Sequence, residues 1–346
     1  MPETDADKTT PGSGAPPGSD ALPGSGARAG IGPRAVGGWT GGQFSLARYL
    51  FGTVLAVLLI VRAVEAIRLF PDHMTTAAHL RPFWLAEGLN LLSIVEHPAM
   101  PIAFMLIAAL MAFFIAAGNF RRAASGVALY LVGCLIAIEP SVLDPRLWPI
   151  CIVLIVLILI PGAPYGSIAA RGRDDPAGNW HMPAWIIVAL WVVLGGIYLT
   201  DGVAKIADAS WRDGSALTES MPSLPSGVAV AIAWSAIVLQ LAFVPLAGWR
   251  VTRTWVWLLA LLQVGRLAAG GAWEPVIAIA SLHLFTFDPR WFRPRVDGEP
   301  LMLFYDGHCG LCHNAVRFVM AEDPGGRLFH FAPLQGDVIK QTLSDD

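Results

Sequence analysis

Eight runs of mostly apolar residues constrain this chain more than any other feature. A helix needs about 20 such residues to cross the roughly 30 Å of hydrocarbon in a bilayer. Only a segment that satisfies its own backbone groups is stable in lipid, so we expect each run to be helical. The sequence therefore predicts an all-α polytopic membrane bundle of about eight transmembrane helices. The runs are residues 46–68, 98–118, 123–141, 147–165, 183–203, 226–247, 252–269 and 272–287.

The overall composition supports a membrane-embedded chain. Hydrophobic residues make up 55% of the 346 positions and charged residues 14%, whereas soluble proteins carry about 25% charged residues. The lipid bilayer is therefore the expected partner. The net charge of −3 argues against a nucleic-acid-binding protein, which would need a basic surface.

The sequence divides into four segments. Residues 1–43 are rich in Gly, Pro and Ser and have no apolar run, so we expect a disordered tail without a signal peptide. Residues 44–287 form the expected transmembrane domain, in which the 71–97 loop suggests an interfacial helix. Residues 288–300 form a charged, proline-containing linker, and residues 301–346 have a different, mixed composition.

Basic residues near the ends of the runs predict the orientation. Cytoplasmic loops carry an excess of Lys and Arg. With the N-terminus and the last segment inside, ten basic residues lie inside and five outside, which predicts a multi-pass cell-membrane protein of this orientation. If the last run only dips into the membrane, the Cys-x-x-Cys segment lies outside instead. The inside set is Arg48, Arg121, Arg122, Arg171, Arg173, Arg250, Arg253, Arg290, Arg293 and Arg295, and the outside set is Arg68, Arg81, Arg146, Lys205 and Arg212.

Several ionisable residues lie inside the apolar runs, where they are costly. Arg62 and Glu65 are three residues apart and can pair on one helix face, and Gln263 and Arg266 share that spacing. His283 is expected to hydrogen-bond to a neighbouring helix, and the alternative is a ligand or a proton carrier. No pattern of metal ligands occurs within a run, so no metal site is expected there.

Lys205, within "YLTDGVAKIADASWRDGSAL", is the most informative residue of the expected membrane domain. A lysine in a dry cavity loses part of its preference for the charged form and could act as a base. The alternative is a lysine that extends from a helix end to the membrane surface. Gly202, one turn earlier, would allow close helix packing.

This stretch resembles the HTTM domain (horizontally transferred transmembrane domain) of vitamin K-dependent gamma-carboxylases and many bacterial membrane proteins. The pattern Tyr-x3-Gly-x2-Lys followed by Trp-x2-Gly carries the resemblance, and "LFTFDPRWFRPR" resembles the end of that domain. The resemblance covers roughly residues 44–295 and implies an eight-helix scaffold with an outward cavity. It also implies that Lys205 occupies the position of the base that deprotonates the quinol.

Two departures from the carboxylases change the expected activity. Their histidine, in a Trp-Asn-Asn-His segment, is replaced here by Cys151 of "WPIC". The large lumenal domain that binds their protein substrate has no counterpart among these residues. Carboxylation of glutamate is therefore not expected.

The segment 301–346 contains a Cys-x-x-Cys pair in a strand–turn–helix–strand pattern. "LMLFYD" suits a strand, "GHCG" a turn, "LCHNAVRFVMAE" a helix and "RLFHFAPL" a second strand. A thioredoxin-like α/β domain begins in this order. Cys309 would lie at the helix N-terminus, where the helix dipole stabilises a thiolate nucleophile, and Cys312 would be the resolving thiol. Asp306 and His308 are placed to tune that thiolate.

"YDGHCGLC" also resembles the Tyr-Asp-Gly-x-Cys-x-x-Cys signature of the DCC family, also called DUF393, described as thiol-disulfide oxidoreductases. This family is commonly fused behind HTTM-type domains. The resemblance implies that Cys309 and Cys312 form the redox-active centre. Such domains are usually longer than residues 301–346, so we expect a truncated domain or one that docks on the membrane domain or a partner.

Other interpretations of the cysteines stay open. Cys309 and Cys312 could supply half of a zinc site shared with another chain, or a purely structural turn. Cys-x-x-Cys followed by His313 also matches the attachment pattern of c-type haem, which the expected cytoplasmic location disfavours. Cys134 and Cys151 lie in apolar runs and are expected to be buried small side chains.

The motifs suggest three functions. The first is a membrane thiol-disulfide oxidoreductase coupled to a thiol partner or to a membrane quinone, which is the cofactor candidate. The second is an HTTM-type transport, export or immunity protein with a vestigial redox segment. The third is an enzyme that depends on Lys205 at the outer face.

Overall fold

The computed structural model describes residues 39–69, 90–94, 97, 99–138, 143–160, 162, 164–171, 180, 182–269, 271–292, 299–323, 326 and 328–339. The expected tail up to residue 38 and residues 71–89 of the expected interfacial helix lie outside this part of the chain. Residues 39–43 of the expected tail belong to the folded part, where the Trp39 side chain is buried.

Each of the eight apolar runs coincides with a helix. Apolar side chains fill these segments, and prolines at the start of α5 and before α6 and α9 suit helix beginnings. The helices are α1 (Gly41–Leu69), α3 (Ala99–Ala117), α4 (Arg121–Ile138), α5 (Trp148–Leu159), α6 (Ala184–Ala207), α9 (Ser226–Gly248), α10 (Arg250–Ala269) and α11 (Trp273–Thr286).

Short helices occupy several of the connections. The turn α2 falls within the loop for which an interfacial helix is expected. Three other turns are 3₁₀-helical. The short elements are α2 (Leu91–Ile94), η2 (Pro145–Leu147), η3 (Ile168–Ala170), α7 (Ala209–Arg212), α8 (Ser215–Ser220) and η4 (Pro289–Phe292).

The expected number of eight membrane spans is wrong for the part of the chain that the structure describes. There, four helices are long and apolar enough to cross a bilayer: Gly41–Ile67, Ala99–Ala117, Ala184–Ala207 and Ser226–Gly248. The helices α5 and α11 have 12 and 14 residues, short of the roughly 20 that a span needs. Arginines open α4 and α10 and shorten their apolar parts. Apart from the small sheet described below, the fold is thus that of an all-α membrane protein in which four helices can span.

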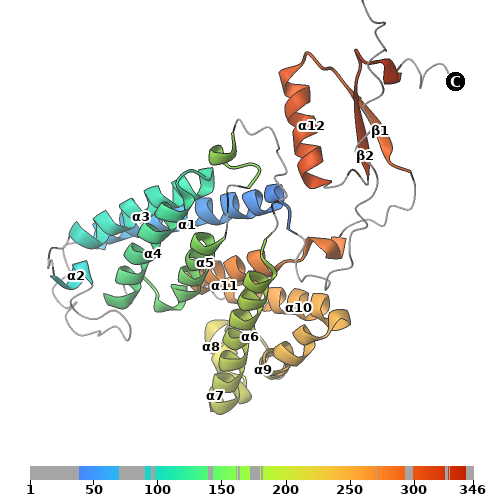
Figure 1. The fold of residues 1–346 in the computed structure, drawn as a ribbon. Coiled ribbons are helices and arrows are strands. Elements are labelled where there is room, and N and C mark those ends of the chain that lie inside the picture. Colours follow the sequence, from blue (N-terminus) through green and yellow to red (C-terminus); the bar gives the residue numbers. More distant parts are fainter. Residues whose placement is uncertain are drawn as a thin grey trace, which may run out of the picture. The chain divides into compact units, whose positions relative to one another are not determined.

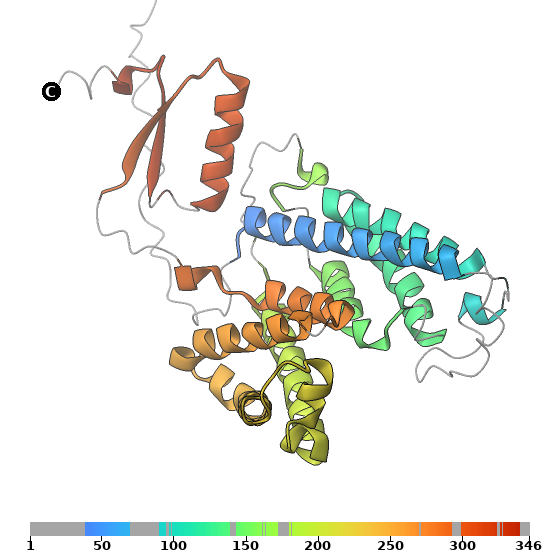
Figure 2. The ribbon, with the colours of Figure 1, turned by 180° about the vertical axis from the view of Figure 1, so that it is seen from behind.

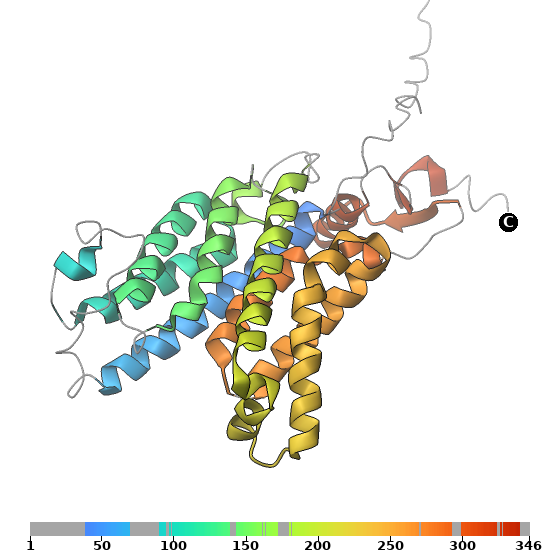
Figure 3. The same ribbon diagram turned by 90° about the horizontal axis from the view of Figure 1, so that it is seen from below.

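The eight longer helices form two groups joined by α11. In one group α1 packs on α3, α3 on α4 and α4 on α5. In the other group α9 packs between α6 and α10, and Figure 3 shows α6 and α9 running side by side. The helix α11 contacts α5 of the first group and both α6 and α10 of the second (Figure 1).

The helices alternate in direction, so two ends of the bundle can be distinguished. The Trp39 Nε1 group, just before α1, donates to the carbonyl of Phe287, just after α11, over 2.7 Å. Arg48, near the start of α1, donates to the Ala116 carbonyl near the end of α3. Arg121, at the start of α4, donates to the Ile160 carbonyl just after α5. We call this end, where α1 and α4 begin and α3, α5 and α11 end, the arginine end.

Close packing in the bundle depends on small residues. At Gly52 of α1, an added Cβ would lie 2.6 Å from the Ala112 carbonyl oxygen of α3, so the two backbones touch only because the side chain is absent. Apolar side chains that face outward stay exposed, including those of Phe113, Val192 and Leu262. Such a surface suits lipid contact.

The last described segment forms a small parallel strand–helix–strand unit (Figure 2). β1 (Leu301–Tyr305) pairs in parallel with β2 (Phe329–Pro333), with Leu301 opposite Phe329 and Tyr305 opposite Pro333. α12 (Gly310–Glu322) connects the strands. A parallel pair requires such a crossover, and the predicted order of strand, cysteine turn, helix and strand is confirmed.

Side-chain contacts among the described residues link α12 to the bundle. The Glu322 carboxylate accepts hydrogen bonds of 2.8 and 2.9 Å from the Thr40 hydroxyl at the start of α1. The rings of Tyr165 and Phe318 lie 6.3 Å apart. The unit therefore touches the bundle near the arginine end.

Candidate functional site

The two cysteines of the pair lie at the start of α12, where β1 turns into the helix. Cys309 is the N-cap residue, with an extended backbone (φ −90°, ψ 113°), and the helix begins at Gly310. A turn at Asp306 fixes the position of Cys309. The Asp306 carboxylate accepts a hydrogen bond of 2.9 Å from the His308 N–H group, and the Asp306 carbonyl accepts one of 3.2 Å from the Cys309 N–H group. Both thiols are free and partly exposed.

Gln335, just after β2, stabilises this turn with two hydrogen bonds. Its Nε2 group donates to Asp306 Oδ1 over 2.8 Å, and its Oε1 atom accepts the Gly307 N–H over 2.9 Å. A Cβ on Gly307 would lie 2.9 Å from that Oε1 atom, so a larger residue here would shift the Gln335 side chain. Gln335 has no local signal in the sequence, because 29 residues separate it from Asp306.

The electrostatic surroundings make the two thiols unequal. The Cys312 thiol and the backbone N–H groups of Cys312 and Leu311 hydrogen-bond to the Cys309 sulfur and lower the pKa of Cys309. The same bond raises the pKa of Cys312, because Cys312 must keep its proton to donate it. Free N–H groups and the positive end of the helix dipole favour a thiolate at such a position. The predicted roles of nucleophile and resolving thiol fit this asymmetry.

The acidic and histidine neighbours act in different ways. The negative charge of Asp306 opposes ionisation of Cys309, so this carboxylate orients the turn rather than activating the thiol. The His308 ring is exposed, with Nδ1 3.7 Å from Asp306 Oδ1. His313 Nε2 hydrogen-bonds to the Gly307 carbonyl over 2.7 Å, so haem ligation by His313 would require this bond to break.

Lys205 is buried near the end of α6, within a polar cluster. Its ammonium group bonds to the Asp201 carboxylate and, over 3.2 Å, to Gln240 Oε1 of α9. Gln240 Nε2 donates to Asp201 over 2.7 Å and closes the triangle. The ammonium also lies 4.6 Å from the centre of the Trp211 ring. With a side chain only 7% exposed, Lys205 does not extend to the surface, and a role as base would require the Asp201 pair to open.

Other residues of the lysine motif have structural roles. A Cβ on Gly202 would lie 3.0 Å from Gln240 Cβ, which confirms the predicted close packing there. Gly214 has a φ of +81°, and an added Cβ would lie 2.8 Å from the Val230 backbone nitrogen. The buried Tyr198 hydroxyl bonds to His283 Nε2 over 2.8 Å, so the predicted interhelical bond of His283 is confirmed.

The paired side chains expected in the first and seventh runs are present. Arg62 contacts Glu65 at 2.8 Å, and Arg266 donates to Gln263 over 3.1 Å. Arg62 also pairs with Glu274 of α11 at 2.5 Å, beside a pocket of about 590 Å³ between α1 and α11. Glu274 was missed, although an acidic residue bordering an apolar run is a signal in itself.

The remaining cysteines are buried, as expected. Cys134 and Cys151 lie in the apolar interior of the bundle as free thiols. Within the described residues, no group of three or more His, Cys, Asp or Glu side chains is arranged to hold a metal ion.

No protein-family model, curated protein or solved structure matches this chain. The similarity to the HTTM and DCC families therefore remains a hypothesis that rests on the quoted motifs.

Proposed function

We propose that this chain is a membrane-anchored thiol-disulfide exchange protein with Cys309 and Cys312 as its reactive dithiol. One observation carries the proposal. At the N-terminus of α12, two free and partly exposed thiols share a hydrogen bond that favours the Cys309 thiolate. Reactive cysteines are accessible and have a stabilised thiolate, whereas structural cysteines such as Cys134 are buried.

The proposed exchange proceeds in two steps. The Cys309 thiolate attacks one sulfur of a partner disulfide, forms a mixed disulfide and releases the other partner sulfur as a thiolate. The Cys312 thiolate then attacks Cys309, which closes the intramolecular disulfide and leaves the partner as a dithiol. Two electrons pass to the partner, and the two protons lost by the cysteines balance those that the partner takes up. A membrane quinone that becomes a hydroquinone could accept the same two electrons.

The resemblance to the DCC signature supports this proposal, and the strand–turn–helix–strand unit has the expected order of elements. We also propose that the arginine end faces the cytoplasm, in line with the excess of positive charge in cytoplasmic loops. Because α11 ends where α1 begins, the dithiol unit then also starts on the cytoplasmic side.

A trapping experiment tests the function. In the purified full chain, a Cys312→Ser variant should accumulate a mixed disulfide between Cys309 and a glutathione disulfide probe, because the resolving thiol is absent. The matched Cys309→Ser variant should accumulate far less adduct. Equal adduct in both variants would show that Cys309 is not a preferred nucleophile and would contradict the proposal.

A second function, passage of a solute through the bundle, is favoured by the pocket beside Arg62 and Glu274. Charged side chains inside membrane helices often line such pathways. Under this alternative the dithiol is vestigial, and the Cys309→Ser/Cys312→Ser double variant keeps the cellular phenotype of the wild type. Loss of that phenotype in the double variant would exclude the alternative.

A further inference from the structure

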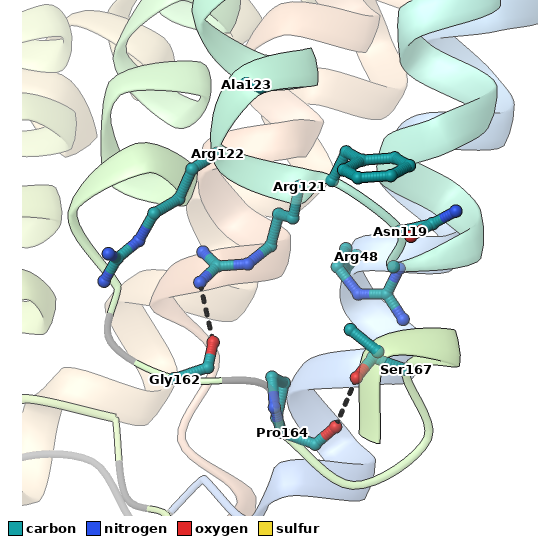
Figure 4. A pocket seen from close by; sticks show the side chains of 11 residues that line it. Arg48, Asn119, Arg121, Arg122, Ala123, Gly162, Pro164 and Ser167 are labelled. Atoms are coloured by element: carbon teal, nitrogen blue, oxygen red, sulfur yellow. Dashed lines mark hydrogen bonds between the residues drawn. The ribbon is translucent and has the colours of Figure 1, made fainter. Parts of the chain in front are cut away.

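A pocket of about 500 Å³ opens at the arginine end of the bundle. Arg48 of α1 and Arg121 and Arg122 of α4 line it, together with the turn after α3 and the loop after α5 (Figure 4). Arg122 is exposed, whereas Arg48 and Arg121 are buried. The pocket thus combines three guanidinium groups where α1 begins and α3 ends, and these two helices are long and apolar enough to span a membrane.

The three guanidinium groups bond to backbone oxygens. Arg48 donates to the carbonyls of Ile115 and Ala116, the latter over 2.7 Å. Arg121 donates to the carbonyls of Leu157, Ile160 (2.7 Å) and Gly162 (3.0 Å), and Arg122 reaches Ile160 over 3.4 Å. Carbonyls satisfy donors at a helix end, but they do not cancel a full positive charge.

No carboxylate of the described residues forms an ion pair with these arginines. The cations at the opposite end differ: Arg62 pairs with Glu274 at 2.5 Å, and Lys205 pairs with Asp201. Clustered buried charges without a counter-ion are costly in a low dielectric. Among the described residues, Arg48, Arg121 and Arg122 therefore have no carboxylate partner, unlike Arg62 and Lys205.

The pocket also has an unused donor in its wall. Arg48 is only 1% exposed, and its Nε group has no hydrogen-bond partner. The backbone is shaped around this side chain: Gly118 has a φ of +72°, and a Cβ there would lie 2.6 Å from Arg48 Nη1. A larger residue at position 118 would displace the guanidinium.

Phe120 adds a strained backbone at the same place. Its φ is +47°, a left-handed conformation that bulky side chains rarely adopt, and its ring is 72% exposed beside the pocket. Strain of this kind persists where the surroundings impose it and clusters at ligand sites. An exposed aromatic ring at the end of membrane helices also suits the interface between lipid tails and headgroups.

We propose that this pocket binds a phosphoryl group, carried by an anionic lipid headgroup or by free phosphate. Guanidinium groups present planar, paired donors that match phosphate oxygens. A bound phosphate supplies a negative charge beside the buried Arg48 and Arg121, and an acceptor for the exposed guanidinium group of Arg122.

Lipid binding to the full chain in neutral detergent tests this site. Native mass spectrometry should show more bound phosphatidylglycerol than phosphatidylcholine. An Arg122→Gln variant should bind phosphatidylglycerol about tenfold more weakly, because it loses a charge-assisted contact without losing a buried side chain. An Arg250→Gln variant, which removes an exposed arginine at the start of α10 outside the pocket, should bind like the wild type.

Inorganic phosphate separates the two sources. If phosphate raises the melting temperature of the wild type but not of Arg122→Gln, and competes with phosphatidylglycerol, the site recognises the phosphoryl group itself. Lipid selectivity without a phosphate effect assigns the site to a headgroup, and the reverse assigns it to soluble phosphate. The proposal is overturned if neither probe distinguishes Arg122→Gln from Arg250→Gln.

Discussion

Polar side chains are bonded differently in the dithiol turn, residues 306–309, and in the Lys205 cluster, formed by Lys205, Asp201 and Gln240. In the cluster, Lys205, Asp201 and Gln240 bond to one another across α6 and α9, and the lysine side chain is buried. In the turn, the surrounding bonds hold the backbone of Asp306 and Gly307, while the thiols of Cys309 and Cys312 stay free and accessible.

The difference indicates what each region contributes. Polar groups that satisfy one another inside a membrane bundle stabilise helix packing, and rearranging them costs free energy. A rigid backbone that holds exposed reactive atoms in place is preorganised for chemistry. We therefore expect changes in the turn to remove reactivity without loss of stability, and changes in the cluster to do the reverse.

The largest effect is expected from Cys309→Ser. Loss of the nucleophile should abolish disulfide formation within the chain, because no other thiol lies close to Cys312 in sequence. The melting temperature should stay within about 2 °C of the wild type, since the site is at the surface. Mass spectrometry after thiol alkylation measures the first quantity, and thermal unfolding in detergent measures the second. A large drop in melting temperature would show that the turn is structural.

Lys205→Met should instead affect stability. Asp201 and Gln240 lose their shared partner, so the free energy of unfolding should fall by about 2 kcal/mol. Denaturant titration in mild detergent measures this change, with Arg212→Gln as an exposed control that should have little effect. Disulfide formation should be unchanged. If stability were unchanged, the cluster would not be the structural element described here, and a role for Lys205 as a base would gain support.

The ion pair at the other end of α1 gives a smaller, graded effect. A double-mutant cycle with Arg62→Gln and Glu274→Gln should give a coupling energy of about 1 kcal/mol, because the Arg62 side chain is 30% exposed and partly screened. The matched cycle with Glu65→Gln should give about 0.3 kcal/mol, as for a helix-surface pair. Equal couplings would contradict a special role for the contact between α1 and α11.

The smallest effect concerns the pH dependence of the thiols. The pKa of Cys309 is lowered and that of Cys312 raised, so below the usual thiol range, about 8.5, Cys309 keeps more thiolate than Cys312. Iodoacetamide should therefore alkylate Cys309 a few times faster at pH 7, and the difference should shrink as the pH rises above both pKa values. In Cys312→Ala the thiol hydrogen bond to the Cys309 sulfur is lost, so Cys309 should be alkylated more slowly at pH 7 than in the wild type. Equal rates at pH 7 would contradict the asymmetry.

The sequence predicted the local features well. Apolar runs located the eight longer helices, and the spacing of Arg62 and Glu65 predicted their contact, because both depend on neighbouring residues. The eight-span count failed because α5 and α11 are short and arginines open α4 and α10. Bonds between distant segments, such as Arg62 to Glu274 and Gln335 to Asp306, have no local signature and required the structure.

The central claim is that Cys309 and Cys312 form a reversible disulfide in the full chain. A titration in glutathione buffers of stepped potential, quenched with an alkylating agent and read by peptide mass spectrometry, measures this directly. We predict one two-electron transition in which both cysteines lose alkylation together and regain it on reduction. Both thiols remaining fully alkylated across the whole range of potentials would contradict the proposed function.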